Sequence, residues 1–199
     1  MLQQIISDHA PAEWSNVNIF NFTTDYNLIG IHNTSDEFQF WARKVSGDFN
    51  LGVTDIYKLE NPFLYAQYLL KKEEYEVIKS TRVLELFHDT ARDNVSSIAS
   101  GNLNWRLSRR VKFGKGVSFS PFPKYANSKS SWNNRKQRVM IIADVLVGKI
   151  EPVDSDVNLP KDDNDTTVGN KGKVYVKYDD NEFYPKIFVY YNSRYDYGY

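Results

Sequence analysis

Two short segments hold the residues whose types and spacing could do chemistry. Glu85–Thr90 carries His88 directly before Asp89, and Gly114–Phe119 carries two glycines around a lysine. A histidine can bind a ligand or exchange a proton near neutral pH, and glycines let a backbone approach a ligand closely. Two other interpretations of His88 stay open: a core histidine bonded to a backbone carbonyl, or a residue that binds a different small ligand in a remodelled cleft.

The composition of the chain excludes several classes of chemistry. Its 199 residues contain no cysteine, which excludes disulfides, cysteine-ligated zinc, iron–sulfur clusters and thiol nucleophiles, and we expect no metal site. No apolar run approaches the roughly 18 residues that span a bilayer, and the first residues lack the pattern of a signal peptide. We therefore expect an intracellular protein of the nucleus or cytoplasm, or a domain of a longer chain, without membrane contact.

The neutral net charge hides an uneven distribution of charged residues. Basic and aromatic residues alternate between residues 106 and 138, a combination that suits single-stranded nucleic acid. The same basic residues could cover a solvated face or pair with the acidic residues 151–165, and no RNA-recognition or KH motif is present. The basic residues of this stretch are Arg106, Arg109, Arg110, Lys112, Lys115, Lys124, Lys129, Arg135, Lys136 and Arg138.

The pattern of apolar residues predicts a single α+β domain over residues 1–199. Short alternating runs in residues 13–59 are typical of strands and turns. Residues 61–78 predict one amphipathic helix, because Asn61 can cap it and Pro62 is tolerated in its first turn.

The remaining elements are predicted from turn signals and apolar runs. Residues 151–172 are polar, acidic and rich in glycine and asparagine, which predicts an exposed, mobile acidic loop. We further expect a strand over 83–87 leading into His88, a helix over 94–100 stopped by Gly101, a long loop over 113–136, a buried strand over 138–148, and two last strands over 173–178 and 186–191 joined by a turn.

Several blocks in a fixed order resemble a known family. They are Phe-His-x-Thr, Asn-Trp-Arg, Gly-Lys-Gly-x-x-Phe, Val-Leu-Val-Gly-Lys, a following apolar strand and Tyr-Pro. This order resembles the catalytic domain of the poly(ADP-ribose) polymerase (PARP) superfamily, and most closely the mono-ADP-ribosyltransferase branch that includes the zinc-finger antiviral protein. The resemblance covers nearly the whole chain. It implies two antiparallel sheets around a cleft for the nicotinamide end of NAD, with a few helices and no helical regulatory domain.

The resemblance also implies where the active-site residues of the family fall. The histidine–tyrosine–glutamate triad, in which many mono-transferases carry isoleucine at the third position, falls on His88, Ser118 and Val174. The histidine bonds the nicotinamide ribose in the family, and the tyrosine packs against the nicotinamide ring. Phe119 supports this register.

The residues implied to bind NAD depart further from the family. Thr90 and Gly116 match, whereas the glycine that offers its backbone to the nicotinamide amide is Asp89. A second ring-stacking tyrosine falls on Lys129, although Tyr125 is an aromatic alternative a few residues away.

These departures predict a degenerate site. Loss of the stacking tyrosines removes contacts of about 0.5–1.5 kcal/mol each, and Asp89 adds negative charge to a cleft that must accept a diphosphate. We therefore expect a catalytically inactive domain without a cofactor that acts as a protein-interaction or scaffold module for an unknown partner. A divergent mono-ADP-ribosyltransferase that uses NAD is one alternative. An accessory domain that contacts RNA through residues 106–138 is another.

Overall fold

A computed structural model describes residues 1–47, 51–78, 80–108, 112–129, 137–155 and 157–193. The larger of its two sheets has five antiparallel strands, and each strand pairs with the next in the order given. The strands are β1 (Asn27–Gly30), β2 (Leu51–Glu60), β9 (Phe183–Ser193), β5 (Arg138–Val147) and β3 (Arg82–Ala91).

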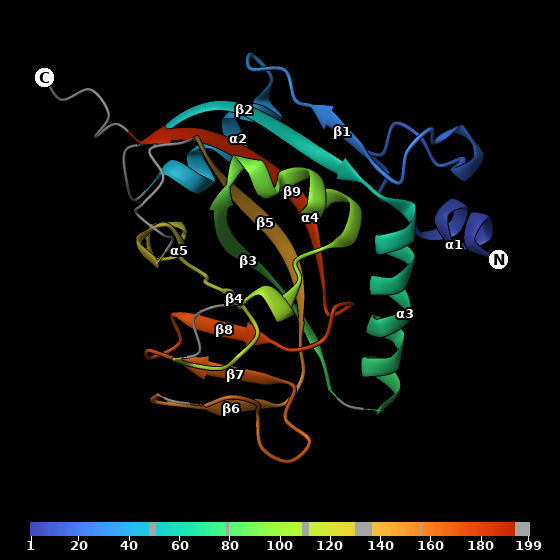
Figure 1. Cartoon of the computed structure of the whole chain (residues 1–199). Coiled ribbons are helices and arrows are strands. Elements are labelled where there is room, and N and C mark those ends of the chain that lie inside the picture. The colour runs from blue at the N-terminus through green and yellow to red at the C-terminus, as the bar shows by residue number, and fades with distance from the viewer. Residues whose placement is uncertain (48–50, 79, 109–111, 130–136, 156, 194–199) are drawn as a thin grey trace, which may run out of the picture.

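The smaller sheet lies across the lower part of the view in Figure 1. Its strands, in order, are β4 (Val117–Phe119), β8 (Val174–Lys177), β7 (Thr166–Gly169) and β6 (Ile150–Pro152). Only the pairing of β6 with β7 is parallel within the part of the chain that the structure describes. The two sheets meet where Phe87 and Ser120 exchange backbone hydrogen bonds of 2.8 and 2.9 Å. The fold is therefore α+β with two sheets and few helices, as the sequence predicts.

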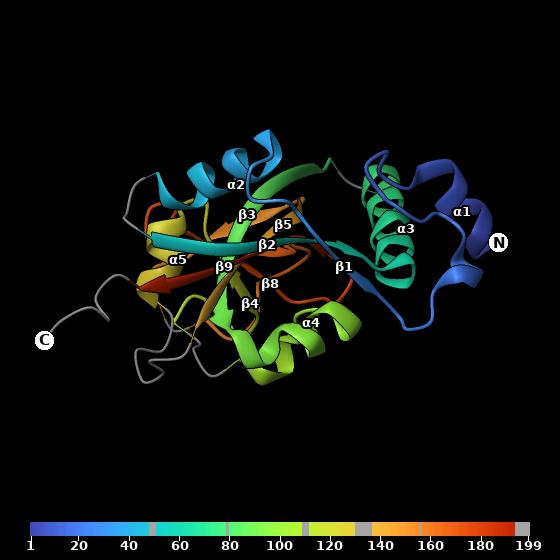
Figure 2. The same cartoon turned by 90° about the horizontal axis from the view of Figure 1, so that it is seen from above.

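Helices cover the larger sheet on both faces. Figure 2 shows α2 and α4 on opposite sides of the sheet, with α1 and α3 at one end. The α-helices are α1 (Leu2–His9), α2 (Asp36–Ser46), α3 (Pro62–Ile78), α4 (Val95–Gly101) and α5 (Pro123–Lys129). The hydrophobic core of the described residues is divided into two clusters, one on each face of the larger sheet, because β5 is buried on both faces. Its odd-numbered residues pack with α3 and α4, and Met140 and Ile142 pack on the side of α2.

The predicted helix over residues 61–78 is confirmed together with its cap. The side-chain oxygen of Asn61 accepts hydrogen bonds from the amides of Phe63 (3.1 Å) and Leu64 (3.0 Å), and Pro62 occupies the first helical position. The buried strand predicted over residues 138–148 is also confirmed, as β5.

The interpretation of residues 13–59 as strands and turns is wrong for α2. The side chain of Ser35 accepts a hydrogen bond from the amide of Phe38 at 3.1 Å and so begins the helix. Acidic residues occupy the first turn and basic residues the last, in the sense that stabilises a helix dipole. Phe38 and Val45 lie on its buried side, seven residues apart, which is a helical spacing that the alternating pattern obscures.

Residues 151–172 are not one exposed loop. Residues 153–155 and 157–164 are largely exposed, but β7 follows, and Thr166 and Thr167 in it are 0% exposed. The polar composition is misleading here because these threonines hydrogen-bond inside the protein: the hydroxyl of Thr166 accepts from Lys177 at 2.8 Å. The predicted long loop over 113–136 likewise contains β4 and α5, and residues 130–136 lie outside the described part.

Candidate functional site

A cavity of about 960 Å³ opens beside the free edge of β3. Its walls come from β3, α4 and the segment after it, β4 and α5. Asn94, the last residue before α4, and Val174, the first residue of β8, also reach it. The residues that the sequence singles out and that line this one cavity are His88, Asp89, Thr90, Lys112, Gly116, Ser118, Phe119, Tyr125 and Val174.

His88 presents its ring to the cavity from β3. Its Nδ1 lies 2.9 Å from the carbonyl oxygen of Ser118, and because a carbonyl only accepts, Nδ1 carries the proton. In the neutral ring Nε2 is therefore an acceptor. Burial lowers the pKa of His88 below its usual value, although the Ser118 bond and the charge of Asp89 act in the opposite direction. His88 thus bonds a backbone carbonyl and lines the cleft at the same time.

The carboxylate of Asp89 does not enter the cleft, contrary to the expectation from the sequence. Adjacent strand residues point to opposite faces, so Asp89 points away from the side that His88 occupies. Its side chain is 0% exposed. One carboxylate oxygen accepts from Nη2 of Arg138 at 2.7 Å, and the other accepts from the hydroxyl of Tyr191 at 2.6 Å. Its charge is therefore compensated inside the protein.

The main chain of Asp89, in contrast, faces the open edge of β3. Phe87 bonds Ser120 through its amide and carbonyl, so these groups point away from β5. Backbone groups alternate in direction along a strand, and those of Asp89, two residues further, point the same way. Asp89 is not among the described residues with positive φ, so this position does not require glycine. It offers one donor and one acceptor at the cleft.

The opposite wall is formed by β4 and β8. Val117 and Phe119 are buried, while the side chain of Ser118 between them is exposed to the cavity. A Cβ at Gly116 would lie 2.2 Å from the carbonyl oxygen of Lys177, so only glycine fits against β8 there. Val174, 6% exposed, gives this wall an apolar surface.

An aromatic wall comes from α5. Tyr125 lines the cavity, and its hydroxyl accepts a hydrogen bond from the side-chain amide of Asn170 at 2.9 Å. The side chain of Lys129 lies outside the described residues. Of the two candidates for the second ring-stacking position, only Tyr125 can therefore be located. Sequence patterns gave no signal for Asn170, because the turn after β7 brings it to the cleft only in the folded chain.

The family model of the poly(ADP-ribose) polymerase catalytic domain matches residues 33–195 of this chain. The chain belongs to this family. It is also similar to the human protein mono-ADP-ribosyltransferase PARP11, with 24% identity over 213 aligned residues that cover 90% of this chain and 62% of the relative. The chain thus spans less than two thirds of the length of that relative.

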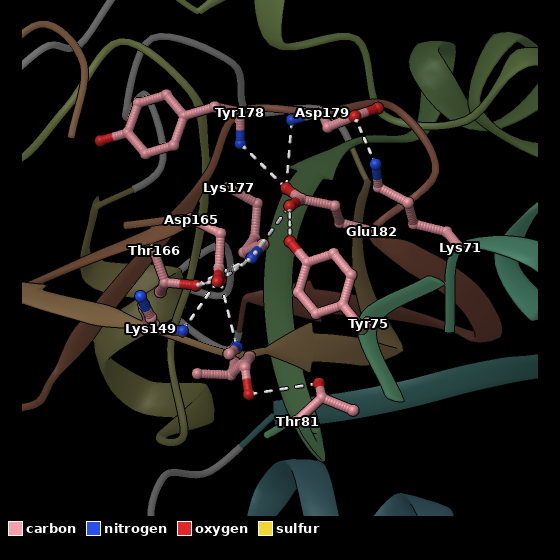
Figure 3. A network of polar contacts seen from close by, with 12 residues as sticks. Lys71, Tyr75, Thr81, Lys149, Asp165, Thr166, Lys177, Tyr178, Asp179 and Glu182 are labelled. Atoms are coloured by element: carbon pink, nitrogen blue, oxygen red, sulfur yellow. Dashed lines mark hydrogen bonds and ion pairs between the residues drawn. The ribbon is translucent and has the colours of Figure 1, made fainter. Parts of the chain in front are cut away.

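A buried charged cluster supports the β8 wall of this PARP-family domain (Figure 3). We call Lys177, Asp165, Thr166, Glu182 and Tyr75 the Lys177 network. Lys177 is 0% exposed, and its Nζ lies 2.8 Å from Asp165 and 3.3 Å from Glu182. The hydroxyl of Tyr75, from α3, donates to Glu182. The network therefore joins the smaller sheet to α3.

Two arginines of the basic stretch are paired with carboxylates in the described part of the chain. The guanidinium of Arg106 bonds both carboxylate oxygens of Asp180 at 2.9 and 2.8 Å, and that of Arg138 is buried against Asp89. Lys112 and Lys115 are exposed. Arg109, Arg110, Arg135 and Lys136 lie outside the described residues.

Two features are absent from the described residues of this domain. None of its helices there is long and apolar enough to cross a membrane. No group of three or more histidine, aspartate or glutamate side chains there is placed to hold a metal ion.

Proposed function

We propose that this PARP-family domain binds NAD in the cleft and transfers a single ADP-ribose unit to a protein, with an affinity for NAD weakened at Ser118. The observation that carries the proposal is the orientation of Asp89, whose carboxylate is buried against Arg138 and Tyr191. The cleft is therefore free of the negative charge that would repel a diphosphate.

The cleft fits NAD in volume and in the polar groups it offers. About 960 Å³ lies within the range of small-molecule sites. The amide and carbonyl of Asp89 suit a carboxamide, which needs one acceptor and one donor, and Nε2 of His88 can accept from a ribose hydroxyl. When bound, NAD supplies the ADP-ribosyl group with nicotinamide as its leaving group.

This geometry reduces the free-energy penalty that the sequence predicts for NAD binding. The side chain at position 89 does not enter the cleft and leaves its backbone open there, and Tyr125 provides an aromatic wall. What remains is the loss of one ring contact at Ser118, worth about 0.5–1.5 kcal/mol. At about 1.4 kcal/mol per decade of affinity, this weakens binding by roughly tenfold at most.

Transfer of a single unit, rather than a polymer, is favoured by Val174. An apolar residue at this position has no carboxylate with which to activate the hydroxyl of a bound ADP-ribose chain. The human relative is a mono-ADP-ribosyltransferase, which supports the same choice.

A second candidate function rests on Ser118 itself. The exposed serine leaves the nicotinamide side of the cleft without the aromatic residue that the family resemblance implies. In that case the domain is inactive and acts as a protein-interaction module, and no turnover of NAD occurs.

Calorimetric titration of NAD, followed by automodification with labelled NAD, tests the proposal. We expect measurable binding and labelling in the wild type, loss of labelling in His88→Ala, and up to roughly tenfold tighter binding in Ser118→Tyr. The absence of heat at millimolar NAD, with no labelling in either the wild type or Ser118→Tyr, would replace the proposal by the inactive module, for which His88→Ala changes stability alone.

A further inference from the structure

The buried carboxylate of Asp89 connects three strands of the larger sheet. Asp89 lies on β3, Arg138 on the neighbouring β5 and Tyr191 on β9, where it pairs directly with Arg138. All three side chains point to the face of the sheet opposite the cleft, because Phe87, Met140 and other residues of the same parity pack there. Asp89 thus sits behind the wall that carries His88.

The network continues from the sheet to α5 through one hydroxyl group. Tyr191 donates its single hydroxyl proton to Asp89 at 2.6 Å, because a carboxylate can only accept. Burial and the charge of Asp89 raise the pKa of Tyr191, so the proton stays on the hydroxyl. The oxygen then accepts from the side-chain amide of Asn127 at 2.6 Å. We call Asp89, Arg138, Tyr191 and Asn127 the Asp89 network.

The helix α5, whose Asn127 donates this bond, also forms a wall of the cleft. Successive residues of an α-helix are about 100° apart, so residues 125 and 127 lie on nearly opposite sides of α5. Tyr125 accordingly lines the cavity while Asn127 bonds Tyr191. Ala126 packs against the core between the larger sheet and α2. A helix of seven residues has little stability of its own and depends on such contacts.

We propose that Asp89, Tyr191 and Asn127 are positioning residues that hold α5 so that Tyr125 forms the aromatic wall of the cleft. The carboxylate acts through Tyr191 and does not touch the ligand. This role accounts for an aspartate at a position where the cleft itself needs only a backbone amide and carbonyl. The effect on ligand binding rests on the proposed function, but the order of α5 does not.

Hydrogen exchange tests the anchoring of α5 without any ligand. We expect Asn127→Ala to increase the exchange rates of the α5 amides roughly fivefold, as for loss of one hydrogen bond, and Tyr191→Phe to increase them at least as much. Lys124→Ala, an exposed substitution on the same helix, controls for changes in helix propensity. Lys44→Ala, in the ion pair of α2 with Glu85, controls for general destabilisation. Unchanged α5 exchange in both network variants overturns the proposal.

A double-mutant cycle with NAD then tests the action through Tyr125. We expect Asn127→Ala to weaken NAD binding roughly fivefold, and the combination with Tyr125→Ala to be no weaker than Tyr125→Ala alone. Losses that add contradict positioning through Tyr125, because a merely structural defect would act independently. If the wild type binds no NAD, the proposed function fails, and the exchange of α5 alone decides whether the network anchors the helix.

Discussion

The Asp89 network and the Lys177 network are built from the same chemical parts, but they are arranged differently. Each buries a cation against a carboxylate that accepts from a tyrosine hydroxyl. In the Lys177 network two carboxylates share one lysine, and the tyrosine comes from the long helix α3. In the Asp89 network one carboxylate pairs with one arginine, and the tyrosine hydroxyl also accepts a hydrogen bond from Asn127 of the short helix α5.

This difference separates two uses of buried charge. The Lys177 network joins the 17-residue helix α3 to the smaller sheet, so its loss should weaken the whole fold. The Asp89 network ends on an element at the edge of the cleft, so its loss should change the cleft as well as the stability. Variants of each network distinguish the two uses, according to whether they change the stability alone or the stability and the affinity of the cleft.

The largest effect is expected for Lys177→Met. Methionine fills a similar volume but leaves Asp165 and Glu182 without their cation, and breaking a buried pair in this way destabilises by about 3–5 kcal/mol. Denaturant unfolding measures the loss. Lys149→Ala is the matched control, because Lys149 pairs with Asp163 while both side chains are largely exposed, and we expect a change of about 1 kcal/mol or less. Equal losses of unfolding free energy in the two variants would show that the buried ion pairs of Lys177 stabilise the fold no more than the exposed pair of Lys149.

The next effect is expected for Asp89→Gly, which introduces the residue that the family resemblance implies. The free energy of unfolding should fall by about 3 kcal/mol, because the buried guanidinium of Arg138 loses its partner. The affinity for NAD should fall too, because α5 loses its anchor.

Calorimetric titration of Asp89→Gly with NAD distinguishes a buried carboxylate that anchors α5 from a carboxylate that faces the ligand. Removal of a repulsive charge from the cleft would instead increase the affinity. Asp89→Asn is the control that removes the charge and keeps an oxygen able to accept from Tyr191. Tighter binding in both variants would contradict the buried orientation of Asp89.

A smaller effect is expected from acid titration of the Lys177 network. Burial alone would raise the pKa of Asp165, but the charge of Lys177 and hydrogen bonds, including those from Thr166 and Gly148, lower it to about 2. A carboxylate with a depressed pKa stabilises the fold above its unfolded pKa of about 3.9, and this stability is lost as the pH falls through the folded value. About 2 kcal/mol should be lost between about pH 4 and pH 2.

Unfolding as a function of pH measures this loss, and Asp165→Asn should flatten the curve in the same window. Burial raises the pKa of Glu182, so its contribution has the opposite sign: stability falls as the pH rises above the unfolded value of about 4.3. The two windows are therefore separate. An unchanged acid slope in Asp165→Asn would assign the loss to other carboxylates.

The sequence predicts best where local signals and burial agree. Asn61 followed by Pro62 marks the start of α3 without reference to the rest of the chain, and the apolar run of β5 is buried on both faces in any arrangement of the domain. It fails where tertiary contacts decide. The polar β7 is buried because Lys177 and its partners satisfy its hydroxyl groups, and α2 is helical although its apolar residues also fit an alternating pattern.

The order of motifs in the sequence was enough to indicate the family, and several residues that the resemblance implies for the site, His88 and Ser118 among them, line the cleft. What those residues present to the cleft depends on the tertiary structure. Strand alternation sends the carboxylate of Asp89 behind the sheet and leaves its backbone at the open edge, and α5 brings Tyr125 to the wall. Which face of β3 meets the cleft depends on strands and helices distant in the chain, so no local pattern around Asp89 could fix it.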